Sequence, residues 1–119
     1  MAVPSLVDYH GVVKDKVIAD IYRKARTLYG SHIAMINSTY QGGGVAELIS
    51  SLMPLINDIG IDAEWRLLHG NPNFFTVTKK IHNGLQGEAV TVSAAEKQLY
   101  LATNENFPSY AHLDHDAII

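Results

Sequence analysis

The sequence of 119 residues contains no cysteine, which excludes disulfide bridges, thiolate metal sites and a cysteine nucleophile. An excess of positive charge is also missing. Nine Lys and Arg residues against 12 Asp and Glu give a net charge of −3, so no basic surface points to a nucleic-acid or membrane partner. The first ten residues lack the basic and apolar regions of a secretory signal, and no apolar run is long enough to span a bilayer. We therefore expect a cytoplasmic protein without membrane or nucleic-acid partners.

What the chain does have is a hydrophobic content of 47%, enough for one modest core. Residues 1–13 show no period and are expected to form an extended arm. In residues 14–30, apolar side chains recur at helical spacing before Gly30, which predicts a leading helix. The remaining expected elements are a strand at 32–37, a helix at 45–59, a strand at 63–68, a helix at 74–86, a helix from Ser93 to about residue 106 and a strand at 116–119.

Strands that alternate with helices predict an α/β fold: a partial Rossmann-like parallel sheet with helices on both faces. Residues 31–119 would form a βαβαα-β half-domain. The last strand stops after four residues, without the loop and helix that usually cover a buried strand, so we interpret the sequence as part of a longer chain. A sheet edge that is normally covered is a template for pairing, which predicts a homo-oligomer.

A glycine-rich turn follows the first expected strand. Gly42, Gly43 and Gly44 stand between Asn37 and a helix that begins near Val45. Glycine allows a sharp turn and a close approach of ligand to backbone, and the first amides of the helix suit a phosphate or a sugar hydroxyl. The spacing is neither that of a dinucleotide fingerprint nor that of a P-loop. The pattern alone leaves two alternatives open, a binding loop and a tight structural turn.

Several longer segments carry a family resemblance. The segment 37–47, with its glycine triplet, resembles the first strand, loop and helix of trehalose synthases of retaining glycosyltransferase family 4, a group related to the trehalose phosphorylases. The similarity continues through residues 51–55 and 60–65. It is most selective in residues 73–87, Asn73-Phe74-Phe75-Thr76-Val77-Thr78-Lys79-Lys80-Ile81-His82-Asn83-Gly84-Leu85-Gln86-Gly87, and returns at 116–119.

The resemblance implies the N-terminal part of the acceptor-side domain of a GT-B-fold enzyme. Such an enzyme transfers glucose from a nucleoside-diphosphate glucose to glucose with retention, or runs the reaction on trehalose with phosphate. It implies substrate contacts from Gly42, Gly43 and Gly44, and from His82, Asn83 and Gln86. No catalytic residue is assigned and no cofactor is expected, and the chain alone should be inactive because donor-side residues lie outside it. The alternative is a non-enzymatic sugar-binding or interaction module.

The other polar candidates have simpler explanations. Glu47 is expected to stabilise the dipole at the start of its helix. His69 follows the second strand, at the edge of the sheet where the topology predicts ligand binding, but it can also be only a loop residue. His82, Asn83 and Gln86 can equally be solvated groups near a helix end. The segment His112-Leu113-Asp114-His115-Asp116 contains metal-ligand types, but adjacent ligands on an irregular loop rarely close a site, so no metal is expected.

Overall fold

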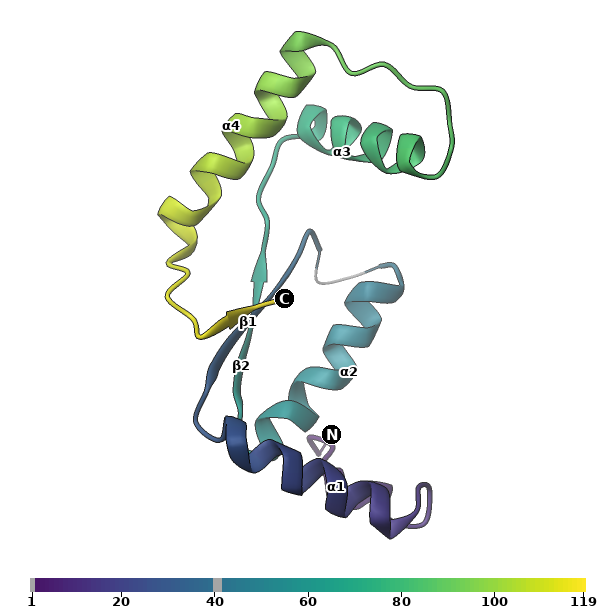
Figure 1. Cartoon of the computed structure of the whole chain (residues 1–119), viewed down its shortest axis with the longest axis vertical. Coiled ribbons are helices and arrows are strands. Elements are labelled where there is room, and N and C mark those ends of the chain that lie inside the picture. Colours follow the sequence, from purple (N-terminus) through teal and green to yellow (C-terminus); the bar gives the residue numbers. More distant parts are fainter. Residues whose placement is uncertain (1, 40–41) are drawn as a thin grey trace. The chain divides into compact units, whose positions relative to one another are not determined.

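A computed structural model describes residues 2–39 and 42–119. The chain divides into two compact units (Figure 1). The first comprises Met1–Leu67 and Asp114–Ile119, and the second comprises Leu68–Leu113. The sequence pattern did not indicate this division. Within the described residues, no helix is both long and apolar enough to cross a membrane.

The first unit is built on a parallel sheet of three strands. These are β1 (His32–Asn37), β2 (Asp62–Leu67) and β3 (Ala117–Ile118), in the order β2-β1-β3. In the register of the sheet, His32 of β1 lies opposite Asp62 of β2, and Ile33 lies opposite Ala117 of β3. The predicted bounds of the first strand are confirmed, and so is the parallel α/β class. The central strand is apolar on consecutive positions because Ala34 and Met35, which point to opposite faces, are both buried.

The described residues of the first unit include two α-helices. α1 (Asp15–Ala25) continues as a 3-10 turn over Arg26–Leu28, and α2 (Gly44–Asp58) connects β1 to β2. α2 packs on the sheet through the buried side chains of Ala46 and Ile49. It remains one helix through Pro54.

The expected extended arm is corrected by the structure. Within residues 1–13, the segment Leu6–Tyr9 forms a 3-10 helix that follows Ser5. Leu6 is buried, and its backbone N–H donates to Oδ2 of Asp58 at 2.8 Å. An apolar anchor and a hydrogen bond therefore fix this segment to the end of α2.

The second unit is a pair of helices, α3 (Pro72–Leu85) and α4 (Ala94–Ala111). Its core contains Phe74, whose ring stacks on Tyr100 with centroids 6.0 Å apart. The predicted capping box is confirmed, because Ser93 Oγ accepts from the Glu96 amide and Glu96 Oε2 accepts from the Ser93 amide. α4 runs five residues beyond the predicted end and includes Pro108. Because α3 and α4 form a separate unit, helices on both faces of the sheet stay a prediction.

Candidate functional site

The carboxyl end of β1 is a point where the strand order reverses. β1 lies between β2 and β3, so the chain leaves β1 toward one neighbour and returns much later on the other side. In open parallel sheets, ligands bind at the carboxyl ends of strands beside such a reversal. The glycine turn begins directly after this end of β1. The topology thus gives the turn a position that ligands commonly use.

The backbone of the turn explains two of its three glycines. Gly42 has φ of +79°, and Gly43 has φ of +83° with ψ of 155°. Side chains other than glycine rarely adopt such angles. Gly44 is the first residue of α2 and has no positive φ, and a Cβ at any of the three positions meets no described atom within 4 Å. Tyr40 and Gln41 of the same turn lie outside the described residues.

The start of α2 presents backbone donors. Gly43 is the N-cap, and no side chain caps it by a hydrogen bond. The first amides of a helix have no partner inside the helix and stand at the positive end of its dipole. An oxygen-bearing ligand, such as a sugar hydroxyl or a phosphate, satisfies both features. Glu47 lies in this first turn, where its carboxylate also suits the dipole.

The other predicted contact residues lie at the end of α3, in the second unit. His82 and Gln86 are exposed, whereas Asn83 is half-buried. Asn83 lines a shallow pocket of about 550 Å³ together with Thr76, Lys79 and Lys80 of α3 and the segment 88–91. This segment returns so close to α3 that a Cβ at Gly84 would lie 2.5 Å from Val90. Of the three residues, Asn83 alone lines this pocket.

His69 occupies the loop between β2 and α3. Its carbonyl accepts a hydrogen bond of 3.2 Å from the Tyr110 hydroxyl, and the two rings are 6.3 Å apart. These contacts fit its interpretation as a loop residue.

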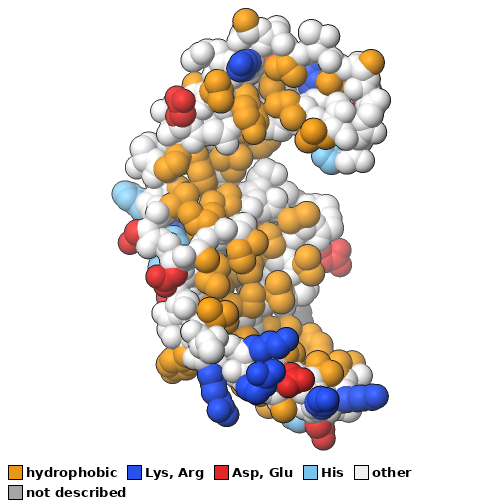
Figure 2. Space-filling model, in the orientation of Figure 1, with side chains coloured by type: hydrophobic (Ala, Val, Ile, Leu, Met, Phe, Trp, Pro, Cys, Tyr) orange, Lys and Arg blue, Asp and Glu red, His pale blue; other side chains and the backbone are white. Residues whose placement is uncertain are grey.

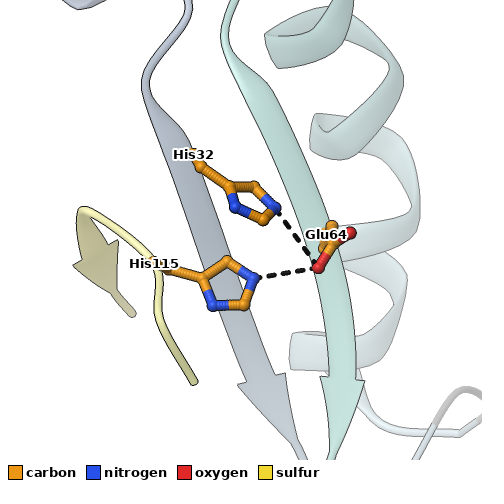
Figure 3. Close-up of side chains that lie close together, drawn as sticks. All are labelled: His32, Glu64 and His115. Carbon is orange, nitrogen blue, oxygen red and sulfur yellow. Dashed lines mark hydrogen bonds and ion pairs between the residues drawn. The ribbon is translucent and has the colours of Figure 1, made fainter. Parts of the chain in front are cut away.

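A cluster of three side chains that the sequence did not predict lies in the first unit (Figure 3). His32 opens β1, Glu64 lies on β2, and His115 precedes β3. His115 Nε2 is 2.9 Å from Glu64 Oε2, and His32 Nε2 is 3.4 Å from the same oxygen. The two imidazole rings are 4.0 Å apart. His115 comes from the segment that contains metal-ligand types, but its partners come from distant strands.

Charge in this cluster is concentrated on Glu64. Hydrogen bonds from His115 and then from Arg66 hold the pKa of the Glu64 carboxyl at about 2, well below its ordinary value. The Arg66 bond runs from Nη2 to Glu64 Oε2 at 2.8 Å. The carboxylate is therefore ionised throughout the neutral range, with three nitrogen-bearing side chains around one oxygen.

An open parallel sheet with a glycine turn at its point of reversal is consistent with a partial Rossmann-like fold. The chain belongs to the family described as the N-terminal domain of trehalose synthase, which matches residues 35–119.

Individual relatives agree with this family. The chain is 40% identical to a trehalose synthase of Pyrococcus horikoshii over 109 residues, which cover 91% of this chain and 26% of the relative. It is 35% identical to a trehalose synthase of Rubrobacter xylanophilus over 81% of this chain and 23% of the relative. A trehalose phosphorylase of Grifola frondosa is 39% identical over 48% of this chain and 8% of the relative. The chain thus spans about a quarter of the length of the synthases that it matches.

Proposed function

We propose that this chain is the N-terminal part of a retaining glycosyltransferase that forms trehalose from a nucleoside-diphosphate glucose and glucose, or phosphorolyses trehalose. Support comes from similarity to both trehalose synthases and trehalose phosphorylases. The observation that carries the proposal furthest is the glycine turn, which lies at the reversal point of the sheet in a chain of this family. In the whole protein, residues 1–119 would be part of the acceptor-side domain of a GT-B fold, in the cytoplasm.

The proposed role of Gly42, Gly43 and Gly44 is to bring backbone amides to the hydroxyls of a sugar. The positive φ values direct the chain into α2, and no described atom lies within 4 Å of a Cβ placed at any of the three glycines, so the described residues leave these donors accessible. Sugar hydroxyls need donors in fixed directions, and backbone amides provide them at little entropic cost.

We further propose that His82, Asn83 and Gln86 contribute sugar contacts at the end of α3. Asn83 has the strongest structural support because it lines a pocket together with the side chains of two lysines. Amide and imidazole groups both donate and accept hydrogen bonds, as a ring of hydroxyls requires.

Nuclear magnetic resonance shift mapping of the 119-residue chain with trehalose and with glucose tests this assignment. The largest shifts are expected at the amides of residues 42–46, with weak affinity because an open surface buries little of a ligand. Sorbitol, which has hydroxyls but no ring, is the matched control ligand. Shifts confined to other parts of the first unit, or equal shifts with sorbitol, would overturn the role of the glycine turn.

A second measurement concerns catalysis. We expect the chain alone to transfer no glucose, because stabilising the leaving phosphate of the donor requires cationic groups that we assign to the remainder of the enzyme. Trehalose formation by the purified chain from any nucleoside-diphosphate glucose would refute this division of labour.

A further inference from the structure

We propose that His32, Glu64 and His115 bind a zinc ion that joins the three strands of the sheet. Their ligand atoms all lie within 4.8 Å of one another, and each residue comes from a different part of the sheet. Donor atoms around a tetrahedral zinc ion are separated by about 3.4 Å, as follows from zinc–ligand distances of about 2.0–2.2 Å. The separation of Glu64 Oε2 from His32 Nε2 is 3.4 Å and equals this value, whereas the separation from His115 Nε2 is 2.9 Å, so the His115 and Glu64 side chains would move slightly apart around the ion.

A buried nitrogen atom without a hydrogen bond supports the presence of a cation. Among the described residues of the cluster, His32 Nε2 is buried without a hydrogen-bond partner and lies 3.4 Å from Glu64 Oε2. Buried polar atoms are normally paired, and an ion is one of the recognised reasons for an exception. His32 Nε2 points toward Glu64 in Figure 3, so a zinc ion between them would satisfy it directly.

The contacts that His115 makes outside the cluster also fit those of a zinc ligand. A histidine that binds zinc through one nitrogen usually donates the other N–H to a carboxylate. His115 Nδ1 has Asp114 Oδ1 at 4.0 Å, within a small side-chain rotation of a hydrogen bond. The side chain of His115 is 0% exposed, which fixes its position. Asp62 Oδ2 lies 3.8 Å from His32 Nε2 at the margin of the cluster, so in this proposal water supplies the fourth ligand.

The chemistry of the donors favours zinc over other common cations. Two imidazoles and one carboxylate suit zinc, whereas calcium and magnesium prefer oxygen ligands alone. Arg66 is the opposing feature, since its guanidinium competes for the oxygen of Glu64 that zinc would bind. This competition gives the test a variant that should strengthen binding.

The position of the cluster indicates a structural ion. His32 is the first residue of β1, whereas the glycine turn follows its last, Asn37, roughly 16 Å away along a strand that rises about 3.3 Å per residue. The backbone of His32 also exchanges two hydrogen bonds of 2.8 Å with Asp116, from His32 N to Asp116 Oδ2 and from Asp116 N to His32 O. Zinc would therefore reinforce the join between β1 and the segment that leads to β3.

The test is a zinc titration of the chelator-treated 119-residue chain against a chromophoric zinc indicator, with cobalt absorption to report the coordination geometry. We expect one ion per chain, a tetrahedral cobalt spectrum and a thermal midpoint that rises with zinc, because an ion that binds the folded state stabilises it. Loss of an outer-shell partner lowers metal affinity by roughly 10–100-fold, so His115→Ala and Glu64→Gln should each cost more than that.

Two further variants keep the result interpretable. His10→Ala is the matched control, because His10 forms a single histidine–carboxylate pair with Asp15 at 3.0 Å in the same unit, and zinc affinity should not change. Arg66→Met should raise zinc affinity, whereas damage to the fold would lower it. The proposal is overturned if the chain takes up no zinc, if His10→Ala weakens binding as much as His115→Ala, or if Arg66→Met lowers affinity. In each case the cluster is a hydrogen-bond network only.

Discussion

Alanine at Gly43 and at Gly44 should change the stability of the chain in opposite directions. Gly43 has φ of +83° and ψ of 155°, a region that is nearly restricted to glycine, so Gly43→Ala should lower the free energy of unfolding by about 1–3 kcal/mol. Gly44 opens α2 without a positive φ, and an added Cβ meets no described atom within 4 Å. Gly44→Ala should therefore raise the free energy of unfolding by about 0.4–1 kcal/mol, because it restricts the unfolded chain.

Urea denaturation followed by tryptophan fluorescence measures this difference. Trp65 is the single tryptophan and lies on β2, so its signal reports the first unit. The two variants should differ by roughly 1.5–4 kcal/mol at equal slopes with urea. A destabilised Gly44→Ala would refute the assignment of this residue to a relaxed helical position.

Comparing Gly43→Ala with Gly44→Ala also distinguishes an effect on ligand binding from an effect on folding. Gly44→Ala leaves the turn intact but places a methyl group at the helix start, so it should weaken trehalose binding while stabilising the chain. A substitution such as Gly43→Val cannot make this distinction, because its φ costs stability whatever the ligand does. If Gly44→Ala binds trehalose as the unaltered chain does, close approach of ligand to this residue is refuted.

The remaining predictions concern other parts of the chain. Phe74→Ala should lower the stability of the second unit by about 3–5 kcal/mol because its ring is 1% exposed, and hydrogen exchange of α3 and α4 measures this against Leu85→Ala, where an 82% exposed residue should cost little. The hydrogen bond from the backbone N–H of Ser93 lowers the pKa of the Glu96 carboxyl in the folded chain. The ionised carboxylate therefore stabilises the fold at neutral pH, and this stabilisation is lost as the pH falls through the lowered pKa. A carboxyl titration by nuclear magnetic resonance should show a midpoint below the ordinary glutamate value. The chain should self-associate at micromolar concentration by light scattering, since the first unit keeps hydrophobic side chains at its surface over α2 (Figure 2), and Leu48→Glu, which charges a 63% exposed position there, should favour the monomer. A monomeric unaltered chain would contradict this.

Local patterns predicted the elements of the fold well. The apolar run at residues 32–37 gave β1 its bounds, and the Ser93 box gave the start of α4, because both signals lie within a few residues of the feature. The end of α4 was missed because helical structure continues past Asn106 through Pro108, a residue that usually marks a stop.

The cluster around Glu64 was beyond the reach of pattern reasoning. Its geometry depends on the register of β1 with β2 and on the return of the chain to β3, which brings His115 to a residue 51 positions earlier. The segment 112–116 gave a signal for metal ligands, but the sequence offered no partner near it. The glycine turn, in contrast, was located from sequence, and the structure adds which of its glycines the backbone requires.

The order of the strands has a consequence for synthesis of the chain. β1 is the central strand, and its pairing from Ala34 to Ile118 joins residues 84 positions apart. At a translation rate of about 5–20 residues per second, β3 is synthesised roughly 4–17 s after β1, so the side of β1 that pairs with β3 stays unpaired for that time. During that interval the backbone donors and acceptors on this side can pair with any extended segment, including β1 of a neighbouring nascent chain. The strand that lies at the centre of this three-stranded sheet is therefore, during synthesis, an edge strand open to pairing with other chains.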